Sequence, residues 1–200
     1  RDPLWSRGLG DVYKRQVGFD AAVSQKFAGE KRRGSLTYIK NTVEEYLSYK
    51  PEPYELLIDN QTVKEKAFLV ACGNASQYGN NAFIAPHANI QDGKMDITIL
   101  SPFGPLDIAP LAIQLFTKQI DRNSKIKTFK GKEVTIIRQN PGVMHLDGEP
   151  IMADSRIEIS VLPKSLNVLT PETVSFTEEV QNLFGEVTRF FDKKLPYIFR

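Results

Sequence analysis

Alternating apolar and polar positions dominate the chain from residue 54 onward and predict a series of short strands. The predicted strands cover residues 54–59, 62–73, 95–100, 125–129, 133–138, 143–146, 156–162 and 166–169. Residues 67–71 are apolar on both faces, so the strand at 62–73 is expected in the centre of a sheet. Residues 95–100 alternate between apolar and polar side chains, which predicts a strand with one buried face.

Helical spacing is confined to a few segments. It predicts a short helix over 21–27, a second helix that Ser35 caps and Pro51 ends, an amphipathic helix over 105–120, and a tail helix over 174–200. About eight short strands with so few helices between them favour an antiparallel β-sandwich with two or three covering helices over an alternating β-α-β array. The long polar segment 74–93 is expected to be functional because of its length.

The composition is that of a globular protein in a reducing compartment. Of the 200 residues, 41% are hydrophobic and 25% are charged, so a disordered chain is not expected. A net charge of +2 argues against a dedicated nucleic-acid-binding protein, which would carry a strong basic excess. The single cysteine, Cys72, cannot form an internal disulfide and lies in an apolar run, which favours a packed thiol in a cytoplasmic protein. No apolar stretch reaches the roughly 20 residues that span a bilayer.

The first sixteen residues show neither the alternation of a strand nor the spacing of a helix, and a regular pattern begins at Val17. This string resembles a translated adaptor at the end of a gene fragment, so residues 1–16 are expected to be a non-native leader. The domain itself is then predicted over 17–171 and the tail segment over 172–200. The alternative is that residues 1–16 form a native loop at the edge of a further domain.

Asp92-Gly93 lies in the polar segment, just before the strand predicted at 95–100. An Asp-Gly pair in this position is typical of a tight turn. A carboxylate together with turned backbone carbonyls also supplies the hard oxygen ligands that Mg²⁺ or Ca²⁺ prefers. The residues by themselves leave both interpretations open.

Asp147-Gly148-Glu149 follows an apolar strand. In a regular strand, residues i and i+2 point to the same side, so the two carboxylates are expected to converge on one site. Such a pair can take a proton from a hydroxyl group or hold a metal that carries phosphate. The alternative is a hairpin turn with two solvated acids.

Several short motifs, taken in order, resemble those of bacterial diacylglycerol kinases and YegS-like lipid kinases. They are Gly18-Phe19-Asp20, Gly73-Asn74-Ala75 through Tyr78-Gly79, Ala85-Pro86-His87-Ala88, Asp92-Gly93-Lys94-Met95-Asp96 and Asp147-Gly148-Glu149. Each motif is weak alone, whereas the ordered set over residues 17–169 is specific. The resemblance implies the β-sandwich second domain of an enzyme of phospholipid metabolism. Such an enzyme transfers the γ-phosphoryl group of ATP to the hydroxyl of diacylglycerol or a related lipid at a membrane surface.

The resemblance also implies roles for the candidate residues. Asp92 would match a side-chain ligand of a structural Mg²⁺, and Asn89 and Lys94 would match positions that bind the same ion through their backbone carbonyls. Glu149 would be the general base on the lipid hydroxyl. Asp147 would share this role or reach the metal through water. The implied cofactor is Mg²⁺, with ATP as the co-substrate.

Two departures from the family pattern are visible. Gly79-Asn80-Asn81 stands where the family often has a glycine run, although asparagine also tolerates left-handed backbone angles. The 200 residues contain no Gly-Gly-Asp-Gly-Thr segment of the kind that binds ATP in the first domain of these kinases. The chain is therefore expected to be the carboxy-terminal half of the enzyme, with the nucleotide-binding half missing, and to be inactive alone.

Other functions remain open on the sequence alone. One alternative is a kinase of the same superfamily that acts on a sphingoid base or NAD, and another is a non-catalytic β-sandwich that binds a ligand. The tail helix ends near the basic pair Lys193-Lys194. It is expected to pack on the domain or on the twin subunit of a homodimer, and the alternative is a helix lying on a membrane surface.

Overall fold

The computed structural model describes residues 14–28, 42, 45–79 and 81–165. The described residues up to Pro163 form one compact unit, which contains every strand and helix described below, and Lys164 and Ser165 fall outside it. The strand predicted at 166–169 and the tail helix predicted at 174–200 lie outside the described residues.

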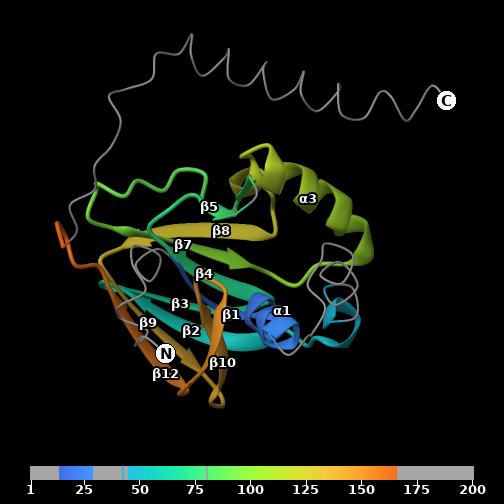
Figure 1. Ribbon diagram of the computed structural model, residues 1–200, viewed down its shortest axis with the longest axis horizontal. Coiled ribbons are helices and arrows are strands. Elements are labelled where there is room, and N and C mark those ends of the chain that lie inside the picture. The colour runs from blue at the N-terminus through green and yellow to red at the C-terminus, as the bar shows by residue number, and fades with distance from the viewer. Residues whose placement is uncertain (1–13, 29–41, 43–44, 80, 166–200) are drawn as a thin grey trace, which may run out of the picture. The chain divides into compact units, whose positions relative to one another are not determined.

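Two antiparallel sheets form a sandwich, and Figure 1 shows them crossing the body of the molecule. The six-stranded sheet, in the order β11-β10-β1-β4-β7-β8, consists of β1 (Lys14–Gly18), β4 (Leu69–Gly73), β7 (Met95–Leu100), β8 (Ile126–Gly131), β10 (Gly142–Leu146) and β11 (Glu149–Ala153). The four-stranded sheet, in the order β12-β9-β2-β3, consists of β2 (Glu52–Ile58), β3 (Gln61–Ala67), β9 (Glu133–Arg138) and β12 (Arg156–Ser160). A small hairpin pairs β5 (Gln77–Gly79) with β6 (Ala82–Phe83). The predicted antiparallel β-sandwich is therefore confirmed.

Helices cover the side of the six-stranded sheet that faces away from the four-stranded sheet (Figure 1). Helix α1 (Phe19–Ala28) begins two residues before the predicted segment 21–27. The helix predicted over 105–120 is divided into a 3-10 turn η3 (Pro105–Asp107), the helix α3 (Ile108–Phe116) and a second 3-10 turn η4 (Ile120–Arg122). The backbone of Lys118 has a φ of 60°, which interrupts the helical path after α3. None of the described helices has both the length and the apolar character needed to cross a bilayer.

The main hydrophobic core fills the space between the two sheets. It is built from the inward-facing residues of both sheets, including Val17, Leu56, Val70, Ile97, Ile99, Val134, Ile136 and Ile159. A second core lies on the other face of the six-stranded sheet, under α3, and includes Leu69, Ala71, Ile84, Leu100, Leu111 and Ile126. The six-stranded sheet is thus the middle layer of three.

Strands β4 and β7 are buried on both faces because they belong to this middle layer. Every residue of β7 is buried, including Asp96 and Thr98 on the face toward the helices. The prediction of one buried face for residues 95–100 is therefore wrong. The prediction took the polar residues of this strand as a solvent-exposed face. Thr98 is buried instead, and its hydroxyl donates a hydrogen bond to the carbonyl of Ile84 (3.0 Å). The central position predicted for the strand at 62–73 is confirmed only for its second part, because β4 lies between β1 and β7 whereas β3 is an edge strand of the four-stranded sheet.

The single strand predicted over 62–73 is in fact two strands in different sheets. β3 ends at Ala67 in the four-stranded sheet, and β4 begins at Leu69 in the six-stranded sheet. Phe68 marks the crossing, where its backbone N–H donates to the carbonyl of Leu100 (2.7 Å) and its carbonyl accepts from the N–H of Phe19 (3.0 Å). Its ring packs among the aromatic rings of Phe19, Tyr46, Tyr49 and Phe103. Strands that switch sheets at a bend are a regular feature of sandwiches.

β1 begins at Lys14, so three residues that the sequence assigns to the leader pair with β4 and β10 in the six-stranded sheet. Their pairing uses backbone groups, which any residue except proline supplies in full. Gln16 is fully buried, and in the described part of the chain neither polar atom of its amide has a hydrogen-bond partner. Gly18 ends the strand with a φ of 96°, and a Cβ there would lie 2.6 Å from the carbonyl oxygen of Phe68. Only glycine fits at this position.

Candidate functional site

The β10–β11 hairpin carries the two acids of the Asp147-Gly148-Glu149 motif. Leu146 pairs with Glu149, which leaves Asp147 and Gly148 as a two-residue turn. Both turn residues have positive φ angles, 47° and 91°, as the tight turns that suit the twist of a hairpin require. Asp147 therefore lies in a turn and Glu149 begins the next strand, so the predicted strand alternation is not what brings them together.

The two acids nevertheless border one cavity. It has a volume of about 1170 Å³ and is also lined by Asp20 and His145. The other walls are mainly apolar and come from α1, α3, the helix-facing side of the six-stranded sheet and the segments around Tyr46 and Phe68. Among these wall residues are Phe19, Tyr46, Phe68, Leu100, Leu111 and Leu115. Small-molecule sites usually measure about 300–1,000 Å³, so this space has room for a long apolar ligand.

A buried histidine fixes the tip of the hairpin. His145 is only 4% exposed, and its Nδ1 accepts a hydrogen bond from the backbone N–H of Gly148 (3.1 Å). Because Nδ1 accepts, the ring proton is on Nε2, which lies 2.7 Å from Oδ2 of Asp20 in α1 and donates to it. The chain Asp20–His145–Gly148 therefore ties the acidic turn to α1. The pairing joins residues 125 positions apart, and the sequence motif at Gly18-Phe19-Asp20 did not reveal it.

A buried arginine fixes the other end of the same hairpin. The guanidinium of Arg138, which is 6% exposed, donates to four backbone carbonyls: Gly142 (2.6 Å), Ala153 (2.7 Å), Val143 (3.1 Å) and Asp154 (3.3 Å). Gly142 and Ala153 are the first residue of β10 and the last residue of β11. The hairpin that carries the acids is therefore held at both ends. No motif in the sequence singles out Arg138.

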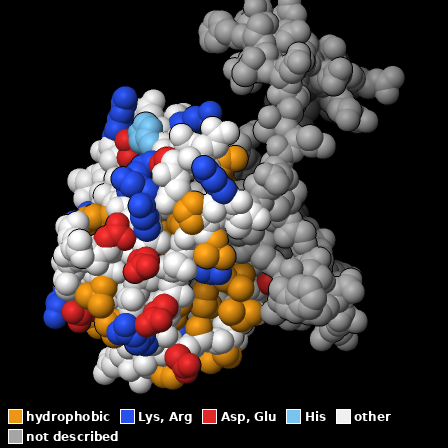
Figure 2. Space-filling view, turned by 90° about the vertical axis from the view of Figure 1, so that its left-hand side faces the viewer, with side chains coloured by type: hydrophobic (Ala, Val, Ile, Leu, Met, Phe, Trp, Pro, Cys, Tyr) orange, Lys and Arg blue, Asp and Glu red, His pale blue; other side chains and the backbone are white. Residues whose placement is uncertain are grey.

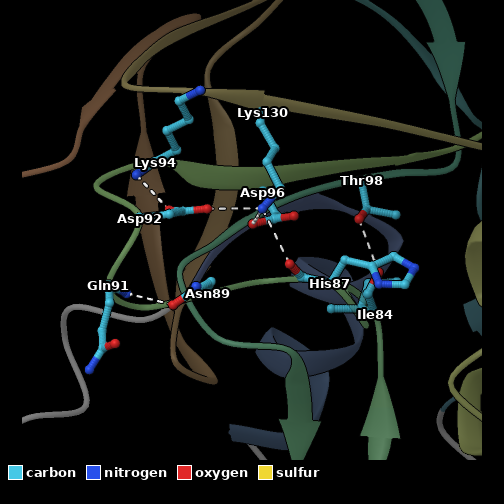
Figure 3. Close-up of polar contacts among 9 residues, drawn as sticks. All are labelled: Ile84, His87, Asn89, Gln91, Asp92, Lys94, Asp96, Thr98 and Lys130. Carbon is cyan, nitrogen blue, oxygen red and sulfur yellow. Dashed lines mark hydrogen bonds and ion pairs between the residues drawn. The ribbon is translucent and has the colours of Figure 1, made fainter.

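The second group of candidate residues lies in residues 87–96, which we term the cation loop (Figure 3). Within it, Oδ1 of Asp92 accepts from the backbone N–H of Lys94 (2.9 Å), and the N–H of Asp92 approaches the carbonyl of Asn89 (3.3 Å). Gly93 has a φ of 67°, so the predicted tight turn is present. Asn89, Asp92 and Lys94 thus lie in one short loop, and their role as ion ligands stays a prediction.

Lys130 of β8 reaches into the cation loop. Its ammonium group donates to Oδ2 of Asp92 (3.0 Å) and to the carbonyl of His87 (3.2 Å), and it lies 3.4 Å from Oδ2 of Asp96. The hydrogen bond from Lys130 is the main cause that lowers the pKa of Asp92, and it raises the pKa of Lys130 in return. Burial raises the pKa of Asp96, while Lys130 opposes this effect.

The donor chemistry of the cation loop fits a hard divalent ion. The atoms that face its interior are carboxylate and carbonyl oxygens, which Mg²⁺ and Ca²⁺ prefer. Asp96 is 9% exposed, and within the described residues its Oδ2 makes an ion pair with Lys130 (3.4 Å) but no hydrogen bond. The described residues contain no group of three or more His, Cys, Asp or Glu side chains placed to hold a metal, so carbonyls and water would have to complete the shell.

The strand register places the acidic hairpin and the cation loop at the same end of the six-stranded sheet. The N–H of Asp147 donates to the carbonyl of Lys14 (3.1 Å). Lys14 pairs with Gly73, which pairs in turn with Asp96. Two strands, β1 and β4, separate β10 from β7. At a strand spacing of about 4.8 Å, the two groups lie about 14 Å apart, too far to share one ion whose ligand distances are about 2.1 Å.

Comparison with known proteins places the chain in a family. Residues 13–170 match the family described as “YegS C-terminal NAD kinase beta sandwich-like domain”. The chain belongs to this family. It is 28% identical over 162 residues to a diacylglycerol kinase of Mycobacterium tuberculosis, a match that covers 78% of this chain and 50% of that protein. It is also 28% identical over 157 residues to a Shewanella frigidimarina protein named “Probable lipid kinase YegS-like”, again covering 78% and 50%.

Solved structures support the same fold for this YegS C-terminal domain. The crystal structure of a diacylglycerol kinase from Bacillus anthracis str. Sterne superposes with a TM-score of 0.52 at 20% sequence identity, covering 76% of this chain and 49% of that one. The predicted resemblance to diacylglycerol and YegS-like kinases is therefore confirmed at the level of family and fold. The chain spans about half the length of these relatives.

Proposed function

We propose that this chain is the lipid-binding half of an ATP-dependent kinase that phosphorylates a hydroxyl group of a diacylglycerol-like lipid. The observation that carries the proposal is that the Asp147-Gly148-Glu149 hairpin borders a large, mainly apolar cavity. A lipid can place its acyl portion among these apolar side chains while its hydroxyl stays beside the carboxylates. The membership in a family that includes named lipid kinases supports this assignment.

Glu149 is the proposed general base. It begins β11, borders the cavity and is exposed, so a hydroxyl group in the cavity can reach its carboxylate. Asp147 lies across the turn and adds a second negative charge beside the same hydroxyl. Asp20 and His145 are positioning residues, because they hold the turn through Gly148 rather than through the substrate. Phosphoryl transfer depends mainly on positioning and charge stabilisation, so a hairpin fixed at both ends suits it.

The phosphoryl donor would be bound largely outside these 200 residues, since they contain no Gly-Gly-Asp-Gly-Thr segment. The end of the six-stranded sheet that carries both the acids and the cation loop is the proposed face toward the nucleotide. Mg²⁺ at the cation loop, about 14 Å from the acids, would neutralise carboxylates and stabilise that end of the sheet rather than bridge the phosphates. Asp92 would supply its side chain, and Asn89 and Lys94 their carbonyls.

A lipid is favoured over NAD or another polar acceptor because aromatic and aliphatic side chains dominate the cavity walls. The test is a phosphorylation assay on the protein completed with its nucleotide-binding half. The assay supplies ATP, Mg²⁺ and a panel of acceptors that contains diacylglycerol, monoacylglycerol, a sphingoid base and NAD. Transfer to a glycerolipid is the expected result. Transfer to NAD alone, or to no acceptor, would contradict the proposal. Residues 14–200 alone are expected to transfer no phosphate.

A further inference from the structure

Lys130 occupies the interior of the cation loop in the way that a bound ion would. Figure 3 shows its side chain entering from β8 with its ammonium group directed at Asp92 and at the carbonyl of His87. The three oxygen atoms within 3.4 Å of Nζ come from Asp92, Asp96 and His87. These are the oxygen types that a hard cation selects.

The two carboxylates of the loop can be neutralised by one divalent cation, whereas two cations beside them would repel each other. Among the groups in direct contact, Asp92 and Asp96 carry two negative charges and Lys130 carries one positive charge, which leaves a net charge of −1 when both acids are ionised. The exposed Lys94 adds a further positive charge to the loop outside this contact. A divalent ion added beside the ammonium group would bring the net charge to +1 and place two cations in contact with the same carboxylates. If Lys130 swings away, the divalent ion neutralises both acids. Its side chain is 38% exposed, so it has solvent to move into.

We propose that Lys130 is a tethered cation that competes with a divalent ion for the carboxylates of the cation loop. In the absence of the ion the ammonium group keeps Asp92 and Asp96 together and the loop folded. Binding of the ion displaces Lys130, so the ion binds more weakly than it would to the loop alone. This inference rests on the proposed divalent-ion site at Asn89, Asp92 and Lys94, and it needs no assumption about the lipid.

The test measures Mg²⁺ binding to the 200-residue chain by calorimetry and by thermal unfolding with and without Mg²⁺, with no nucleotide or lipid present. Lys130→Met removes the competing charge and keeps an apolar stem of similar length. We expect it to tighten Mg²⁺ binding at least about tenfold, which corresponds to about 1.4 kcal/mol. The variant should also melt at a lower temperature than the wild type without Mg²⁺ and regain most of the difference when Mg²⁺ is added. Lys130→Arg keeps the charge and the donors, so it should bind Mg²⁺ as weakly as the wild type.

Lys127→Met is the matched control. Lys127 lies on the same strand and pairs with Glu65 of β3 instead of the cation loop. The substitution Lys127→Met removes one positive charge from β8, as Lys130→Met does. If Lys127→Met tightened Mg²⁺ binding as much as Lys130→Met, the effect would be one of general charge, and the proposal would be overturned. Unchanged Mg²⁺ affinity in Lys130→Met would overturn it as well. If Lys130→Met does not fold without metal, Lys130→Gln retains a hydrogen-bond donor without the charge and is measured in its place. Absence of Mg²⁺ binding in every variant would refute both the competition and the ion site, while the lipid assay would still decide the kinase function.

Discussion

The two Asp-Gly turns at one end of the six-stranded sheet use the same dipeptide in opposite ways. Asp147-Gly148 closes a two-residue hairpin whose side chains border a cavity, and the turn is held from behind by His145. Asp92-Gly93 folds its carboxylate back onto the N–H of Lys94 and onto the ammonium group of Lys130. The first turn places its acids at the border of a cavity, whereas the carboxylate of the second is bound by a lysine of a neighbouring strand.

The difference shows that an acidic turn takes its role from the groups around it. The hairpin is fixed by neutral or buried contacts, namely a histidine and an arginine that bond mainly to backbone atoms. The cation loop is fixed by charges that a metal ion can replace. Chemistry is therefore expected at the hairpin, and ion-dependent stability at the loop. Figure 2 shows a face of the molecule where acidic and basic side chains are interspersed.

Replacing the proposed base tests this comparison with the largest expected effect. Glu149→Gln keeps the size of the side chain and removes the base, so turnover on a confirmed lipid substrate should fall by about 10²- to 10⁴-fold. Asp147→Asn should also lower turnover. Both are measured in the completed enzyme, with ATP binding and thermal unfolding as checks that the fold is intact. Glu158→Gln, an exposed acid of β12, is the control and should behave as wild type. Wild-type turnover in both hairpin variants would mean that the motif is only a turn.

Removing the anchor at the other end of the hairpin should cost stability. Arg138→Met leaves four backbone carbonyls without their donor, and we expect the free energy of unfolding to fall by about 3 kcal/mol. Arg138→Lys should recover only part of this loss, because an ammonium group cannot reach all the carbonyls that a guanidinium fork reaches. Urea unfolding measures the effect. The exposed Arg156→Met should change stability by less than about 0.5 kcal/mol, and a similar value for Arg138→Met would rule out an anchoring role.

The histidine that positions the turn can be tested with two amides of different length. The oxygen of asparagine can replace Nδ1 and accept from Gly148, whereas the amide of glutamine reaches toward Asp20 instead. We expect His145→Asn to keep most of the turnover and His145→Gln to lose about tenfold, about 1.4 kcal/mol in the barrier. Nitrogen NMR of the wild-type imidazole should show the proton on Nε2. Equal activity of the two variants, or a proton on Nδ1, would argue against the positioning role.

The smallest expected effect concerns Cys72 in β4, a strand that lies between the two turns in the sheet. Burial raises the pKa of Cys72 to about 12 from an ordinary value of 9.0, so the thiol stays protonated in the folded state at pH 8. Because the folded value lies above the ordinary one, the stability linked to this group is fully present below pH 9.0 and is lost as the pH rises through about 12. A thiol reagent at pH 8 should therefore label Cys72 only after unfolding. Rapid labelling of the native protein would show that the sheet opens between the two turns.

Local patterns and motif order were sufficient to predict the fold class, the family and most of the strands. Period-2 alternation predicted strands that correspond to β2, β8, β9, β10 and β12, because local burial on one face leaves a local pattern. The order of short motifs was sufficient to indicate the family that the match over residues 13–170 confirms. The residues Asp92, Asp147 and Glu149 were selected by type and position, and their chemical roles stay predictions.

Only the tertiary structure decided which sheet each strand joins and what surrounds each acid. The residues at the crossing, Ala67, Phe68 and Leu69, are all apolar and include no glycine or proline that would mark a break between β3 and β4. The bonds from Lys130 to Asp92 and from His145 to Asp20 join residues 38 and 125 positions apart. Such contacts leave no periodic signal, because the partners are brought together by strand pairing and by the packing of α1 on the sheet. The sequence therefore shows which residues are able to do chemistry, and the packing decides which carboxylates border a cavity and which bind a lysine.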